Sequence, residues 1–251
     1  MSLWSRVKFI SVSVKNALKI KEMWRSVLFF CLVGVIVPNF ADYLYYYQLN
    51  ISKFSKFEYS MITLLGFAAL LLSSLVYNLL LKNYEERCLL GIAMLINCLG
   101  QIGTLLYVLK VTLGMSPLLF VALTSTITDT IYLAMSNLPS MVLFAKLIPS
   151  SIESSMFALL MGLMNLCTTM LSKLLGNFYN SYIGVSNDSL EDIWKLYVIS
   201  SVLCVIPLTL VWLLPTKVAV SAVQRVYEYQ DMRQSGKLDK CDFTKIDPEV
   251  A

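Results

Sequence analysis

The chain has 251 residues, of which 57% are hydrophobic and only 14% are charged, and its formal net charge is +4. Average soluble domains carry about 25% charged residues, and the mean hydropathy of this sequence is +0.69, so an ordinary soluble domain is excluded. The sequence contains no histidine, which excludes Ser–His–Asp and Cys–His catalytic sites and histidine-ligated metal centres. We therefore expect no enzyme, no catalytic residues, no metal and no other cofactor, and no nucleic-acid partner.

The N-terminal segment, residues 1–24, combines apolar and basic residues. Leu3, Val7, Ile10 and Val14 recur at helical spacing, with lysines between them. This pattern predicts an amphipathic helix that lies in the membrane interface. A mitochondrial transit peptide is the alternative interpretation, because no acidic residue precedes Glu22.

Residues 25–215 contain six long apolar segments, and each has at least the roughly 20 residues that a helix needs to cross a bilayer. Their expected bounds are 26–48, 57–81, 88–112, 117–145, 155–182 and 193–214. No segment alternates polar and apolar residues with a period of two, so a transmembrane barrel is not expected. The sequence therefore predicts an all-α membrane protein with six transmembrane helices in one bundle. Residues 216–251 are more polar and predict a helix and tail outside the membrane.

The basic residues are distributed unequally between the two sides of the six predicted spans. Fifteen of the 20 lysines and arginines lie on one side. By the positive-inside rule this is the cytoplasmic or matrix side, so both termini are expected there. The protein is therefore expected to be an integral, multi-pass membrane protein whose host membrane the sequence does not specify, with the mitochondrial inner membrane as one alternative. The fifteen residues are Arg6, Lys8, Lys15, Lys19, Lys21, Arg25, Lys82, Arg87, Lys146, Lys217, Arg225, Arg233, Lys237, Lys240 and Lys245.

Three charged side chains lie inside the predicted spans and more than three residues from their ends: Asp42 in the first, Asp129 in the fourth and Lys173 in the fifth. A charge at the centre of the bilayer costs about 2.5–3.5 kcal/mol on the insertion scale, so each of these residues needs a reason to be there. One interpretation is a structural ion pair, or a lysine that extends to the membrane surface. The other is a polar cavity that binds a solute, which the neighbouring residues favour.

Those neighbours form two stripes at helical spacing. Stripes of small residues usually pack one membrane helix against another, but packing does not explain Asp129 or Lys173. We therefore expect the stripes to face a common side of the bundle together with the polar residues of the first span, and Asp129 either to exchange protons or to pair with Lys173. The fourth-span stripe is Ser125, Asp129, Tyr132, Ser136 and Pro139, and the fifth-span stripe is Ala158, Gly162, Asn165, Thr169, Ser172 and Gly176.

The segment from 149 to 166 also carries a recognisable pattern. It has Pro149, Glu153, Ser155, the run Phe157-Ala158-Leu159 and Asn165. By residue type and spacing it resembles the signature of the folate–biopterin transporter family, a branch of the major facilitator superfamily. Ser151 replaces the usual glycine, and Gly162 stands where a serine is common. The run "YLYYYQLN" after Pro38 and the segment "LVYNLLLK" resemble earlier helices of that family.

This resemblance implies the C-terminal six-helix half of a major-facilitator-type bundle, because full members have about twelve spans in two halves with the pathway between them. The implied partners are the lipid bilayer and a second six-span half, from the same or another chain, or a larger membrane complex. The implied function is transport of a folate- or pterin-like anionic or zwitterionic solute by alternating access. The alternative is a non-transporting accessory or structural subunit of a larger complex, derived from a transporter half.

The resemblance and the charged residues together suggest roles for individual side chains. Lys173 would attract the carboxylate of the solute, and Asn165 with Tyr132 would bond or stack its ring. Asp129, with Asp42, would exchange protons or pair with Lys173. Pro149 and Glu153 belong to the signature, where Glu153 at the start of a helix would favour the helix dipole and act as a gate.

Overall fold

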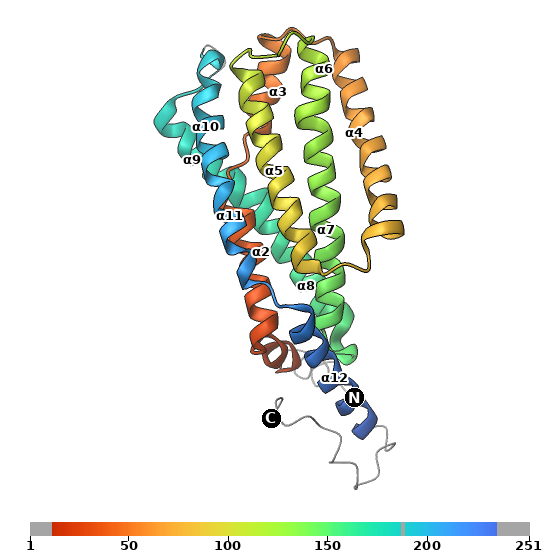
Figure 1. Ribbon diagram of the computed structural model, residues 1–251. Helices are drawn as coiled ribbons and strands as arrows, with labels where there is room; N and C mark the ends of the chain where they lie inside the picture. The colour runs from red at the N-terminus through yellow and green to blue at the C-terminus, as the bar shows by residue number, and fades with distance from the viewer. Residues whose placement is uncertain (1–11, 187–188, 235–251) are drawn as a thin grey trace.

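The computed structural model describes residues 12–186 and 189–234, which form helices and connecting loops without a strand among them. Six helical segments are long and apolar enough to cross a membrane: Lys21–Asn50, Lys56–Leu81, Glu86–Val108, Pro117–Leu147, Glu153–Ile183 and Leu190–Leu213. They form one elongated bundle (Figure 1). The predicted all-α class with six spans is confirmed. The first span begins at Lys21, earlier than the expected residue 26.

Most of the spans are not uninterrupted α-helices. The first consists of α2 (Lys21–Ile36) and α3 (Ala41–Asn50), and the second of α4 (Lys56–Val76) and the π-helical η1 (Tyr77–Leu81). The third is α5 (Glu86–Val108). The fourth consists of α6 (Pro117–Val121), the π-helical η2 (Ala122–Thr126) and α7 (Ile127–Leu147). The fifth consists of α8 (Glu153–Asn165), the π-helical η4 (Leu166–Leu171) and α9 (Ser172–Ile183), after the 3-10 turn η3 (Ser150–Ile152). The sixth consists of η5 (Leu190–Asp192), α10 (Ile193–Leu203), α11 (Val205–Leu210) and η6 (Val211–Leu213).

Local sequence signals account for several helix ends. Ser55 and Glu58 form a capping box at the start of α4, each side chain bonding the backbone N–H of the other. Ser116 caps α6, and Pro117 occupies its first turn. Gly184 ends α9 with a φ of 75°, a left-handed conformation that favours glycine.

The two ends of the described chain lie at the same end of the bundle. Residues 12–18 are helical and lead through a short turn into α2, whereas the first part of the predicted interfacial helix, residues 1–11, lies outside the described residues. The helix α12 (Lys217–Gln234) follows the sixth span, and Figure 1 shows it beside the start of α2. The predicted tail beyond residue 234 also lies outside the described residues.

Two main hydrophobic cores hold the bundle together, one towards each end. The core nearer α12 joins α2, α5, α7 and α8 through fully buried side chains that include Met23, Leu90, Phe144 and Met156. The core at the opposite end is rich in aromatic residues. It joins α3, α5, α6 and α10 through Phe40, Tyr47, Tyr107, Phe120, Ile193 and Tyr197.

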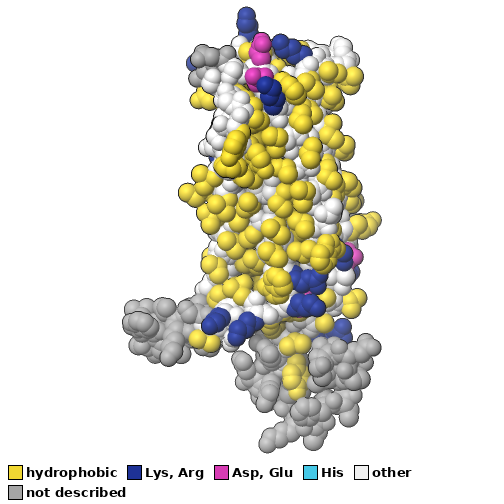
Figure 2. Space-filling model, turned by 90° about the vertical axis from the view of Figure 1, so that its left-hand side faces the viewer, with side chains coloured by type: hydrophobic (Ala, Val, Ile, Leu, Met, Phe, Trp, Pro, Cys, Tyr) yellow, Lys and Arg dark blue, Asp and Glu magenta, His cyan; other side chains and the backbone are white. Residues whose placement is uncertain are grey.

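The outer surface of the bundle is strongly apolar along its length. Figure 2 shows hydrophobic side chains over the middle of one face, with basic and acidic groups gathered near the two ends. On α4, side chains such as Phe67, Leu71 and Leu72 are exposed. A contiguous apolar surface of this kind is costly in water and is stable against lipid or another apolar surface, as expected of an integral membrane protein.

Candidate functional site

The first span is broken in its middle, at Pro38. The backbone is not helical from Val37 to Phe40, because proline cannot donate the N–H that would continue the helix and disfavours the helical conformation before it. Asn39 stabilises the break: its N–H donates to the carbonyl of Ser172 at 3.1 Å, and its side-chain Oδ1 accepts from the N–H of Ala41 at 2.9 Å. The fifth span therefore directly supports the break in the first.

The fifth span approaches this break closely because of one glycine. A Cβ atom added at Gly176 would lie 2.6 Å from the carbonyl oxygen of Asn39, so a larger residue would force the two backbones apart. The π-helical segment η4 comes immediately before the contact, and Ser172 donates a hydrogen bond to the carbonyl of Thr168 there. Short π-helical segments are frequent at functional sites.

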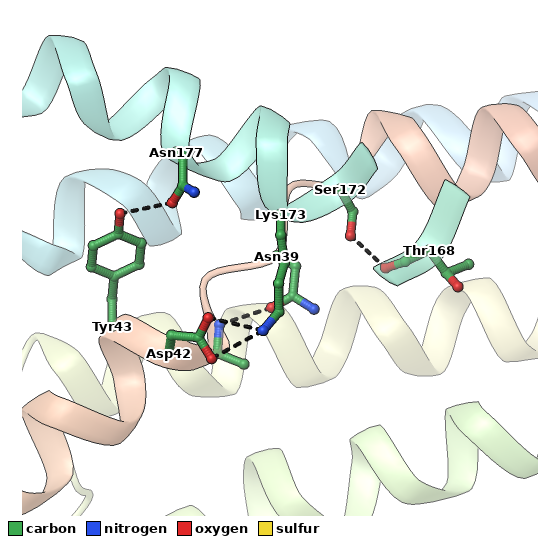
Figure 3. A network of polar contacts seen from close by, with 8 residues as sticks. Asn39, Asp42, Tyr43, Thr168, Ser172, Lys173 and Asn177 are labelled. Carbon is green, nitrogen blue, oxygen red and sulfur yellow. Dashed lines mark hydrogen bonds and ion pairs between the residues drawn. The ribbon is translucent and has the colours of Figure 1, made fainter. Parts of the chain in front are cut away.

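This junction creates an ion pair between the first and fifth spans. The Nζ of Lys173 lies 2.9 Å and 3.1 Å from the two carboxylate oxygens of Asp42 (Figure 3). Asp42 lies in the first turn of α3, where the helix dipole favours its negative charge. The side chains are 68% exposed for Asp42 and 43% exposed for Lys173, so both charges are accessible from outside the bundle.

The partner of Lys173 is therefore Asp42, and the expected pairing with Asp129 is wrong. Asp129 lies on α7, and its side chain is exposed. Its Oδ1 is 3.0 Å from the position that a Cβ on Gly100 of α5 would occupy, so α5 is its close neighbour. The break at Pro38 turns α3 towards α9 and brings Asp42 to Lys173 instead.

A network of polar side chains extends from the ion pair along α3 and α9. The hydroxyl of Tyr43 donates to Oδ1 of Asn177 and accepts from Nδ2 of Asn180, each at 3.0 Å. Asn180 also bonds both the N–H and the carbonyl of Val185, which holds the turn after α9 in place. Figure 3 shows Tyr43 and Asn177 directed towards each other from the two helices.

A hollow of about 430 Å³ opens beside this network. Its volume lies in the range of about 300–1,000 Å³ that is usual for small-molecule sites. One wall is aromatic, because Tyr46 is exposed there and its neighbour Tyr45 packs edge-on against both Tyr46 and Tyr59. The lining residues are Asp42, Tyr43, Tyr46, Asn177, Ser186 and Leu190.

The fourth-span stripe is mostly a packing surface. Ser125 and Pro139 are buried, and the hydroxyl of Ser125 donates to the carbonyl of Val121 in its own span. Tyr132 is half-buried and packs against the core nearer α12 and against a smaller cluster around Tyr77. Within the described residues, no hydrogen bond or ion pair joins Asp129 or Tyr132 to the Asp42–Lys173 pair. The fourth-span stripe is therefore not bonded to this ion pair, and a common polar site of the two stripes stays a prediction.

The fifth-span stripe changes character along its length. Ala158, Gly162, Asn165 and Thr169 are exposed, and no atom lies within 4 Å of the place where a Cβ on Gly162 would be. Ser172 and Gly176, further along, are buried against the first span. The first part of the stripe is thus an open polar face in this chain.

The signature residues lie at the opposite end of the fifth span from the ion pair. Pro149 ends the loop after α7, and Glu153 is exposed in the first turn of α8. In the described part of the chain, no group of three or more acidic or cysteine side chains is placed to hold a metal ion.

The sequence-based reasoning identified Asp42 and Lys173 but missed the other residues of the hollow. Tyr43, Tyr46 and Asn177 were not singled out as site residues. The tyrosine-rich run before residue 48 was the signal, because three tyrosines in succession inside a predicted span are unusual for a surface that only contacts lipid. The ion pair between Glu86 and Lys146, which joins α5 to α7, was also not foreseen.

The fold and this site define an integral multi-pass membrane protein with charged groups held at a break in a span, an arrangement typical of transporters. Residues 2–230 match the BT1 family, and the chain belongs to this family. The resemblance seen in the 149–166 segment is thereby confirmed at the level of the family.

Curated relatives of the chain are named as folate-biopterin transporters. The chain is 26% identical over 207 residues to the "Folate-biopterin transporter" of Synechocystis sp., a match that covers 78% of this chain and 42% of the relative. It is 25% identical over 205 residues to "Probable folate-biopterin transporter 2" of Arabidopsis thaliana, covering 80% and 41%. It is 28% identical over 202 residues to "Probable folate-biopterin transporter 7" of the same plant, covering 78% and 45%. The chain therefore spans less than half the length of these relatives. No solved structure matches it.

Proposed function

We propose that this chain forms one six-span half of a membrane transporter and that the hollow beside Asp42 and Lys173 receives its solute. The observation that carries this proposal is an accessible ion pair at a broken span, opening into a hollow with tyrosine walls. In many transporters, substrate sites lie where a discontinuous helix exposes its ends near the midplane of the membrane. The junction of α2, α3 and α9 has these features.

The solute we propose is an anionic or zwitterionic heteroaromatic compound of the folate or pterin type, whose ring enters the hollow and whose carboxylate reaches Lys173, which pairs with the lining residue Asp42. The ammonium of Lys173 binds a carboxylate of the solute, which competes with Asp42 for it. The rings of Tyr43 and Tyr46 offer faces and edges to a heteroaromatic ring, and the amide of Asn177 supplies a hydrogen bond. The relatives are named as folate-biopterin transporters, and these names favour the same class of solute.

Alternating access requires a second six-span half, from the same polypeptide or another chain, because the pathway of such transporters lies between two repeats. The exposed polar face with Gly162, Asn165 and Thr169 is the surface offered to that half. Asp129 acts there as a proton-exchanging group, and Tyr132 and Asn165 contact the solute along its path. Glu153, with Pro149, acts as a gate at the other end of the fifth span.

A chimaera tests this function. The segment of the Synechocystis transporter that this chain matches is replaced by the chain itself, and uptake of labelled folate and of labelled biopterin is measured in cells that express the chimaera. We expect uptake above the level of cells without the transporter. We also expect Lys173→Gln to abolish most of it, since the solute then loses its cationic partner.

The matched control is the ion pair of Lys195 with Asp192 at the start of the sixth span, which has a similar N–O distance of 2.8 Å and in which neither residue lines the hollow. Lys195→Gln should leave uptake almost unchanged. A chimaera that inserts normally and transports neither solute would contradict the proposal and favour the accessory-subunit alternative.

A further inference from the structure

A second, smaller pocket lies at the end of the bundle that carries α12. Its volume is about 160 Å³, and residues from α2, α5, η6 and the start of α12 line it. Two guanidinium groups, those of Arg25 and Arg87, face this pocket together with the exposed side chain of Trp212. The folate-type solute proposed above has no role here, because the hollow beside Asp42 lies towards the other end of the first span.

The close packing of α5 against the end of the sixth span forms the pocket. A Cβ on Gly91 would lie 3.7 Å from Cγ1 of Val211, so α5 is in contact range of the Val211 side chain one turn after Arg87 and one residue before Trp212. Arg25 completes the wall. Its Nη2 donates to the carbonyl of Trp212 at 3.4 Å, and its guanidinium lies 5.8 Å from the centre of the indole ring.

The charges around the pocket favour an anion. Glu22 is the acidic residue among its lining residues, so two positive charges face one negative charge. The neighbouring carboxylates are otherwise engaged, since Glu86 pairs with Lys146 and Glu85 accepts the backbone N–H of Lys217. Within the described residues, neither Arg25 nor Arg87 forms an ion pair with a carboxylate. Two guanidinium groups with free N–H donors match the geometry of a phosphate group.

We propose that this pocket binds the phosphate of an anionic phospholipid from the leaflet on the side of α12. Trp212, 60% exposed at the end of its span, marks the level of the membrane interface, where tryptophan is enriched. Basic pockets between membrane helices on the cytoplasmic or matrix side are recognised sites for anionic headgroups.

The surface next to the pocket distinguishes a lipid from a soluble phosphate. From Arg87, α5 continues into the membrane with an exposed apolar stripe that includes Ile92, Leu95 and Leu99. The sixth span, which packs against α5, exposes Val202 and Val205. Acyl chains attached to a bound headgroup would lie against these side chains, whereas a soluble phosphate ester would gain nothing from them.

Native mass spectrometry of the purified full chain in detergent measures the binding. The probes are short-chain phosphatidylglycerol, phosphatidylcholine of the same chain length and glycerol 3-phosphate. We expect phosphatidylglycerol to bind more tightly than either of the others. Each charge near the membrane surface contributes roughly a fivefold change in affinity, so Arg25→Gln and Arg87→Gln should each weaken phosphatidylglycerol binding about fivefold.

Two further variants make the result decisive. Glu22→Gln removes the opposing charge and should tighten phosphatidylglycerol binding by a similar factor, which a misfolded protein would not do. Lys82→Gln combined with Arg225→Gln removes two positive charges from the same side outside the pocket and should change the affinity little. Equal binding of phosphatidylcholine, equal binding of glycerol 3-phosphate, or an equal loss in the control variant would each overturn the proposal.

Discussion

A lysine inside an apolar span keeps its charge only if a partner or water compensates for the lost hydration. In this chain Asp42 supplies that partner for Lys173, and Asp42 lies in the first turn of α3, where the helix dipole favours a negative charge. The pair is accessible, so a competing anion can approach Lys173 without unfolding either helix. Lys173, which the ion pair with Asp42 stabilises when no anion is bound, can in this way also take part in the proposed binding.

A double-mutant cycle tests the coupling of these two residues. Asp42→Asn alone leaves the ammonium of Lys173 unpaired in the span, and Lys173→Gln alone leaves the carboxylate of Asp42 unpaired, so each change should destabilise the protein. The double variant should recover much of this loss. The measurement is the thermal stability of the purified protein in detergent. The control cycle is Asp192→Asn with Lys195→Gln, an exposed pair for which we expect a coupling of at most about 1 kcal/mol. Strict additivity at Asp42 and Lys173 would contradict the pairing.

Tyr227 fixes α12 to the end of the fourth span. Its hydroxyl donates to the carbonyl of Leu147 at 3.2 Å, and burial raises the pKa of this phenol to about 12. The raised pKa means that this contribution to stability is intact below pH 10, the usual pKa of tyrosine, and is lost as the pH rises from there through the folded value.

Replacing Tyr227 by phenylalanine removes the donor and should loosen α12 by about 1 kcal/mol at pH 7. Hydrogen exchange followed by mass spectrometry should then show faster exchange in α12, while α5 is unchanged. Tyr229→Phe is the matched control on the same helix, because in the described residues its hydroxyl makes no hydrogen bond to α7. An exchange rate in α12 that is the same in both variants and the parent would show that the bond does not hold the helix.

At the scale of helices, the six spans could be predicted because hydrophobic length is a local property of the sequence. The partners of their charged residues could not. Which carboxylate meets Lys173 depends on the direction that α3 takes after Pro38 and on the crossing of α9 at Asn39, and both depend on packing between segments more than 130 residues apart. The π-helical segments η2 and η4 were also unpredictable, since a single extra residue in a turn leaves no clear pattern in an apolar run.

Two glycines in the fifth span separate internal packing from an open face. Gly176→Ala would place a Cβ 2.6 Å from the carbonyl of Asn39, and the forced shift should cost about 1–3 kcal/mol. Gly162→Ala meets no atom within 4 Å and should be neutral or stabilising by up to about 1 kcal/mol, because alanine favours helix. Thermal stability of the two variants is the measurement.

A larger side chain at Gly162 tests where the proposed second six-span half packs. If another six-span unit packs on the exposed face around Gly162, then Gly162→Leu should lower uptake by the chimaera while leaving the stability of this chain alone intact. Leu166→Ala, also at an exposed position of the fifth span, tests whether any change on this helix has the same effect. Unaltered uptake in Gly162→Leu would exclude that face as the meeting surface.

At the scale of the whole molecule, the bundle has two chemically different ends joined by an apolar surface (Figure 2). One end carries the loop with Lys82, the ion pair of Lys146 and the start of α12. The other carries the loop from Leu109 to Ser116 and the hollow beside Asp42. The hollow proposed to receive the solute therefore lies towards one end, and the proposed lipid pocket towards the end that carries α12.

The orientation of the bundle in its membrane follows from this asymmetry and can be measured. Because the sequence assigns fifteen of the 20 basic residues to the side of α12, the positive-inside rule predicts that this end faces the cytoplasm or matrix and that the hollow faces the opposite compartment. In a variant whose native cysteines are replaced by serine or alanine, a single cysteine at Asn83 should react with a membrane-impermeant maleimide only after the membrane is opened. A single cysteine at Leu113, which is 75% exposed in the opposite loop, should react in intact cells.

Labelling of Asn83 and Leu113 from the same side would show that the chain does not cross the membrane an odd number of times between them. That result would rule out the third span. The reverse pattern would keep the six spans but invert the bundle. The hollow proposed to receive the solute would then open on the cytoplasmic or matrix side.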